Sequence, residues 1–162
     1  MRRSVLPIAA ILLTAACSSP KAATTVNADS SAGKPLTAST AFSKLSVKSA
    51  TVTGTVTAAN DPNHLLGRPN QYTSKVTFTD SRIKAADVSG TEKGAVERGG
   101  AIEVFADPAD AKARATYIRA VTKSMPALSE YDYVHGTVLV RVSHYLTPDQ
   151  AAAYKKASDK LS

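Results

Sequence analysis

The sequence predicts an α+β fold, in which an antiparallel or mixed sheet of about five strands carries two main helices packed on one face. Three observations support it: strand-like segments alternate apolar and polar residues, helix starts place proline after a capping side chain, and strands and helices are interspersed along the chain. Ahead of them we expect a signal peptide (residues 1–16) and a lipidated cysteine with a disordered tether (17–40). A single α+β domain would occupy residues 41–162.

The first sixteen residues have the layout of a secretory signal peptide. Arg2 and Arg3 form a basic head, residues 5–16 form an apolar run, and Ala15 and Ala16 supply small side chains at its end. The run is shorter than the ~20 residues that a permanent membrane-spanning helix needs. We therefore expect export, by the general secretion route or the twin-arginine route.

Cys17 is the only cysteine of the chain. The stretch Leu13-Thr14-Ala15-Ala16-Cys17 resembles the lipobox of bacterial lipoproteins, although Thr14 stands where leucine is more usual. The resemblance implies that the thiol of Cys17 receives a diacylglyceryl group and that a peptidase cleaves just before it. Membrane lipid would then be a partner through Cys17, and the protein would lie on the extracytoplasmic face of the cell membrane. The alternative is an ordinary signal peptide with a chance cysteine.

The segment after Cys17 predicts a tether. Residues 18–40 are rich in Ser, Thr and Ala and contain no aromatic side chain. Such a segment buries too little apolar surface to offset the entropy that ordering it costs. We expect it to let the domain work on or just above the membrane face.

Alternation with a period of two predicts the strands. In the segment 50–58, every second residue from 51 to 57 is threonine. In the segment 72–79, Val76 and Phe78 alternate with polar side chains. This pattern is typical of a strand with one buried and one solvated face. A hairpin turn is expected at His135-Gly136. The remaining expected strands are residues 101–106, 131–134 and 138–145.

Two main helix starts follow from capping residues. Asp107 precedes Pro108, which predicts a helix that continues to about Lys123. Thr147-Pro148-Asp149-Gln150 has the sequence of a capping box and opens the last helix. The first helix is expected to bury Ala113, Tyr117, Ile118 and Val121, and the last helix to run through Tyr154, Ala157 and Leu161.

The segment between the first two strands, residues 63–72, concentrates polar and charged side chains and is the candidate ligand loop. His64, Arg68 and Tyr72 would contact an anionic or polar ligand, with the rigid guanidinium of Arg68 supplying the charge. The alternative is structural, because two leucines of the same segment could cap the core after a single helical turn.

No motif of a known catalytic site is present. The chain lacks a Gly-x-Ser-x-Gly elbow, a His-Glu-x-x-His helix and a phosphate-binding glycine loop, and its histidines are scattered. We therefore expect no enzyme, no catalytic or metal-binding residues and no cofactor. The leading function is a membrane-anchored extracytoplasmic lipoprotein that acts as a non-catalytic binding or interaction module at the cell envelope. A small envelope hydrolase is the third alternative.

The formal net charge of +7 favours anionic partners. The basic residues are dispersed and are not interleaved with aromatic ones, so nucleic acid is not an expected partner. We expect an anionic envelope component or another envelope protein instead.

Three segments, Asn63 to Lys75, Gly100 to Ala113 and Tyr131 to Val142, resemble small secreted lipoproteins of actinobacteria and their mobile elements. These are proteins of unknown function, so the resemblance implies no catalytic residue. It implies a second possible function, an envelope protein of a phage or mobile element that blocks superinfection or conjugation.

Overall fold

The computed structural model describes residues 35–161. The expected signal peptide, Cys17 and most of the expected tether lie outside the described residues. In chain order the elements are α1 (Ala38–Leu45), β1 (Ala50–Thr55), β2 (Ser74–Asp80), a 3₁₀ turn (Val96–Arg98), β3 (Gly99–Val104), α2 (Pro108–Thr122), a second 3₁₀ turn (Pro126–Leu128), β4 (Glu130–His135), β5 (Val138–Ser143) and α3 (Pro148–Ser158).

The strands form one antiparallel sheet in the order β1-β2-β3-β5-β4. This confirms the α+β fold and the five-stranded sheet. The tight turn between β4 and β5 consists of Gly136 and Thr137, one residue later than expected, and Gly136 has a positive φ of 53°. A left-handed backbone at this position suits glycine, which has no Cβ to clash.

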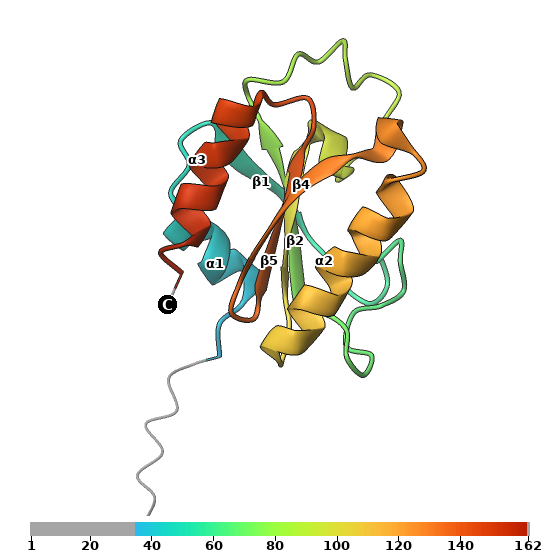
Figure 1. Cartoon of the computed structure of the whole chain (residues 1–162), viewed down its shortest axis with the longest axis vertical. Coiled ribbons are helices and arrows are strands. Elements are labelled where there is room, and N and C mark those ends of the chain that lie inside the picture. The colour runs from blue at the N-terminus through green and yellow to red at the C-terminus, as the bar shows by residue number, and fades with distance from the viewer. Residues whose placement is uncertain (1–34, 162) are drawn as a thin grey trace, which may run out of the picture. The chain divides into compact units, whose positions relative to one another are not determined.

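The helices cover both faces of the sheet, which corrects the expectation that the two main helices share one face. Figure 1 shows α1 and α3 on one side of the sheet and α2 on the other. Val138, Val140 and Val142 of β5 pack in the core beneath α1 and α3, whereas Leu139 packs beneath α2. The uninterrupted apolar run 138–140 is typical of a strand that needs cover on both faces.

The first helix, α1, begins inside the segment expected to be a tether. Thr37 caps it, and the side chain of Thr40 bonds back to the Thr37 backbone N–H, so the two residues form a capping box. Ala38, Ala41 and Leu45 are buried against the sheet. Residues 38–40 therefore belong to the folded domain.

Both expected helix starts are present. Asp107 accepts a hydrogen bond from the Ala109 N–H at 2.7 Å, and Thr147 forms the capping box of α3 with Gln150. The buried face of α2 differs from the expected one, because Tyr117 is 61% exposed and Ala113 is also exposed. The buried side chains of α2 are Ala111, Ala115 and Ile118.

Within residues 35–161, none of the helices has the length and apolar character needed to cross a membrane.

Candidate functional site

Tyr72, one of the three residues of the expected ligand loop, is a structural residue. It is completely buried, and its hydroxyl donates to the carboxylate of Asp61 at 2.7 Å. Asp61 also accepts the backbone N–H groups of Leu65 and Leu66 at 2.8 and 2.9 Å. Burial opposes the charge of Asp61, but these hydrogen bonds outweigh it and lower the pKa of Asp61 to about 2. The hydroxyl of Tyr72 is thus committed to holding the loop.

His64 and Arg68 are brought together by this loop. Both are exposed, and both line a hollow of about 210 Å³ beside Asp61. His64 adopts a positive φ of 52°. The structure therefore separates the expected trio: His64 and Arg68 share a small surface hollow that Tyr72 does not line.

Two larger cavities, of about 570 and 620 Å³, adjoin each other on the face of the sheet that α2 partly covers. Pro62, Lys75, Gly94 and Ala95 line both of them, and together we name them the α2-face cleft. Strands β2, β4 and β5 supply its charged floor through Lys75, Glu130 and Arg141. Its apolar wall consists of Leu65, Ile118, Val121 and Leu128.

Glu103 of the central strand β3 organises the charges beneath the cleft. Its side chain is fully buried and lies directly opposite Lys75 in the register of β2 and β3. It contacts Lys75 Nζ at 3.1 Å, Arg114 Nε at 3.2 Å and an Arg141 nitrogen at 3.1 Å. Burial acts to raise the pKa of Glu103, but the three cations outweigh it and lower that pKa below its usual value. Glu103 is therefore a buried anion that holds three cations in place.

Arg141 links Glu103 to a second carboxylate. Its Nε and one terminal nitrogen contact the two oxygens of Glu130 at 2.8 and 2.9 Å, in the bidentate geometry that suits guanidinium. Burial lowers the pKa of Lys75, and Glu103 offsets part of this effect. The cluster of Lys75, Arg114, Arg141, Glu103 and Glu130 holds three cations and two carboxylates, so it carries a net positive charge.

Arg114 extends from α2 to the edge of the cleft. Only its Nε is hydrogen-bonded within the described part of the chain, to Glu103, while the guanidinium lies 5.8 Å from the ring centre of Tyr117. An arginine carries five N–H donors. The terminal nitrogens of Arg114 are therefore left for water or a ligand in the cleft that Arg114 lines.

Asp132 lies on the same face of the sheet, next to Glu130 and directly opposite Arg141 in the register of β4 and β5. Its carboxyl oxygens are buried and have no hydrogen-bond partner among residues 35–161. Burial, together with the neighbouring charge of Glu130, raises the pKa of Asp132 to about 8. The Nε of Arg119, an α2 residue whose side chain is 59% exposed, lies 3.8 Å from Oδ2 of Asp132. Burial beside Glu130 thus favours the protonated form of Asp132.

Reasoning from the sequence missed every member of this cluster. The alternation in residues 72–79 placed Lys75 on a solvated face, yet it is only 5% exposed. One signal was available: Glu103 stands between Ile102 and Val104, in a strand whose residues are all buried. A charged residue in such a run needs partners of opposite charge.

Among the residues that the structure describes, no group of three or more His, Cys, Asp or Glu side chains is placed to hold a metal ion. The hydrogen-bond donors at the floor of the α2-face cleft belong to the cations Lys75, Arg114 and Arg141, which suit an anion, while Glu92 and Glu97 also line the cleft. Comparisons with known protein families, with curated proteins and with solved structures found no match to this chain, and its resemblance to small secreted lipoproteins stays a prediction.

Proposed function

We propose that this protein is a non-catalytic binding module, held at the outer face of the cell membrane by lipid on Cys17, and that the α2-face cleft binds a ligand with an anionic group. The observation that carries the ligand proposal is the cluster at the floor of the cleft, in which three cations meet two carboxylates. The other charged residues that line the cleft are Lys93, Glu92 and Glu97. Asp132 does not remove the excess of cations in the cluster. When it ionises, Arg119 balances its charge.

The chemistry of the cleft specifies the ligand further. Lys75 and Arg114 offer donors that Glu103 holds in fixed positions, and hydrogen bonds between such cations and a carboxylate or phosphate are strong. The apolar wall lies beside these donors. A molecule with a carboxylate or phosphate at one end and an apolar part next to it would satisfy both features.

A titration with small model compounds tests the ligand proposal. The chain from residue 17 onward, with Cys17→Ser, would be titrated with hexanoate, hexyl phosphate and the neutral analogue hexanol while amide chemical shifts are recorded. We expect the two anions to shift residues that line the cleft and to bind more tightly than hexanol. Arg114→Ala should weaken anion binding about tenfold or more, because a charge-assisted hydrogen bond is lost.

Arg119→Ala is the matched control, because this arginine also lies on α2 but does not line the cleft. It should leave the affinity for hexanoate unchanged. Equal binding of hexanol and hexanoate, or equal losses in the two variants, would contradict an anion site in the cleft.

Membrane attachment is tested separately by fractionating cells that express the full chain. Cys17→Ser should move the protein from the membrane fraction to the soluble extracytoplasmic fraction, because two acyl chains provide a stable anchor that the variant lacks. Unchanged membrane association and gel mobility in the variant would show that Cys17 is not lipidated.

A further inference from the structure

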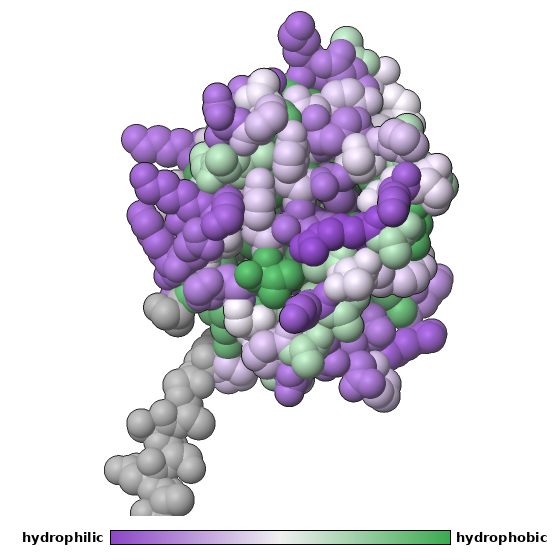
Figure 2. Space-filling model, in the orientation of Figure 1, coloured by the Kyte–Doolittle hydropathy of each residue, from purple (hydrophilic) through white to green (hydrophobic). Residues whose placement is uncertain are grey.

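A second charged surface lies on the opposite face of the sheet, between α1 and α3. Figure 2 shows hydrophilic side chains gathered over the side of the domain where α3 lies. A groove of about 640 Å³ runs there between the two helices. Five of the residues that line it are cations, and none is acidic: the cations are Lys44, Lys48, Arg82, Lys156 and Lys160. We name this surface the α1–α3 groove.

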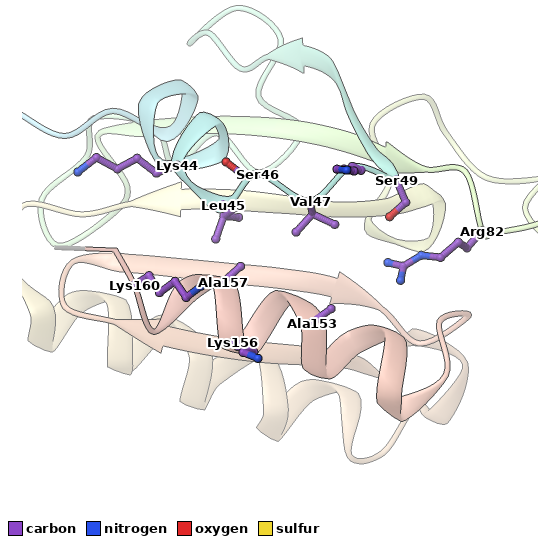
Figure 3. Close-up of a pocket in the computed structure, with 11 residues that line it drawn as sticks. Lys44, Leu45, Ser46, Val47, Ser49, Arg82, Ala153, Lys156, Ala157 and Lys160 are labelled. Atoms are coloured by element: carbon purple, nitrogen blue, oxygen red, sulfur yellow. The ribbon is translucent and has the colours of Figure 1, made fainter.

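Small side chains on α3 keep the groove open. In Figure 3, Leu45 and Val47 point toward α3, and Ala153 and Ala157 face them from that helix. Alanine at both positions leaves the space that larger side chains would fill. The side chain of Lys156 on α3 lies beside this opening, as does that of Lys160, two residues beyond the end of the helix.

One of the five cations is already neutralised. Arg82 makes two hydrogen bonds with the buried carboxylate of Asp80, at 2.9 and 2.6 Å. Tyr154 and Ser49 donate to the same carboxylate at 2.6 and 3.0 Å. Arg82 thus belongs to the internal structure of the domain, and the excess charge of the groove comes from its lysines.

Lys48, Lys156 and Lys160 carry this excess. Within residues 35–161 no carboxylate lies within ion-pair distance of any of the three. Lys155, the neighbour of Lys156 on α3, is by contrast paired with Asp159 at 2.9 Å and does not line the groove. The two lysines in this part of the chain that make no ion pair in the described residues, Lys156 and Lys160, are therefore the two that line the groove.

The cations are spread along the groove. In Figure 3, Lys44 and Lys160 lie toward one end, Arg82 reaches in from the other, and Lys156 lies between them. This spacing suits a surface that carries many phosphates better than a single bound anion. Helix α1, which forms one wall, is also the first element of the domain after the predicted lipid anchor.

We propose that the α1–α3 groove binds the headgroups of anionic phospholipids. The lysines would lie against the phosphate layer, with the domain in contact with the membrane through this side. The proposal rests on the lipid anchor of the proposed function for keeping the groove near a membrane. Headgroup binding itself can be measured without the anchor, and it leaves the α2-face cleft, on the other side of the sheet, open to its ligand.

Vesicle binding tests the proposal. The chain from residue 17 onward, with Cys17→Ser, would be mixed with vesicles of equal parts phosphatidylglycerol and phosphatidylcholine, or of phosphatidylcholine alone. We expect binding to the anionic vesicles only. Each lysine near an anionic surface strengthens binding about fivefold, so Lys156→Gln with Lys160→Gln should weaken partitioning roughly 25-fold.

The matched control is Lys112→Gln with Lys123→Gln, an equal loss of charge from exposed lysines of α2 and its C-terminal cap, on the other face of the sheet. It should change partitioning by less than about twofold, because these lysines would not meet the headgroups. Equal losses in the two double variants would show that only net charge matters, and would overturn the proposal.

Inorganic phosphate at the same total phosphate concentration distinguishes a headgroup surface from a site for free phosphate. The protein should stay on the anionic vesicles in its presence. Release by phosphate, or undiminished vesicle binding by the Lys156→Gln, Lys160→Gln protein, would overturn the proposal. None of these readouts depends on lipidation of Cys17 or on hexanoate binding in the cleft, so failure here is distinct from failure of the proposed function.

Discussion

Replacing Asp132 by asparagine should change how the stability of the domain depends on pH. The pKa of Asp132 is about 8 in the folded protein and 3.8 for an unperturbed aspartate. Between these values the folded state holds one proton more than the unfolded state, so the free energy of unfolding falls as the pH rises. The stability that this group contributes is complete below about pH 4 and is lost as the pH rises through 8.

The size of the effect follows from the same two pKa values. A difference of about four pH units corresponds to an upper limit of about 6 kcal/mol, at 1.36 kcal/mol per unit. The measured effect should be smaller, because Arg119 is exposed and can move onto the carboxylate of Asp132 as it ionises. We expect wild type to lose about 2–3 kcal/mol more than Asp132→Asn between pH 5 and pH 9.

Urea unfolding of both proteins across this pH range measures the difference. Asparagine keeps the shape of the protonated side chain and cannot ionise, so the two proteins should be similar at low pH and the variant should be more stable at high pH. Asp87→Asn, at an exposed loop position, is the control and should follow wild type. Parallel curves for wild type and Asp132→Asn would refute the reasoning, as would a variant that is less stable by the same amount at every pH.

Three further substitutions test the internal structure, each by urea or thermal unfolding. Glu103→Gln should destabilise the domain by about 3–5 kcal/mol, because it removes the buried carboxylate that Lys75, Arg114 and Arg141 share. A loss below 1 kcal/mol would contradict that arrangement. Gly100→Ala should cost about 1–3 kcal/mol, since a Cβ there would overlap the carbonyl oxygen of Arg141 and the ring of Phe78; an unchanged melting temperature would count against this close packing. Tyr72→Phe should cost about 1–2 kcal/mol through the lost hydrogen bond to Asp61, and a neutral result would show that the backbone N–H groups alone satisfy that carboxylate.

Local patterns in the sequence were sufficient to predict the strands and most helix starts. The interactions that fix a helix start join residues only a few positions apart in the chain. The capping side chains of Asp107 and Thr147 bond to N–H groups two and three residues along the chain. Helix α1 shows how composition alone misleads. The segment around it is rich in Ser, Thr and Ala, yet Thr37 and Thr40 form a capping box, and Ala38, Ala41 and Leu45 have the spacing of one helix face.

The side of the sheet on which each helix lies could not be predicted in the same way. Alternation in β2 identified Val76 and Phe78 as core residues, and both are buried. It could not show that α2 and the loops around Pro62 and Gly94 cover much of the other face, since those segments are distant in the sequence. Lys75 is buried because α2 and these loops lie over it.

The same limit explains why the net charge of the chain did not reveal either candidate site. A formal charge of +7 describes lysines and arginines as one set, but the fold divides them into groups with different surroundings. Arg141 faces one side of the sheet and is fixed by Glu103 and Glu130. Lys156 and Lys160 line the groove on the other side and make no ion pair within the described residues. The first arrangement stabilises the domain and shapes a specific cleft, because its charges are held by buried partners. The second contributes little to stability and is available to a partner, because its charges lie at the surface.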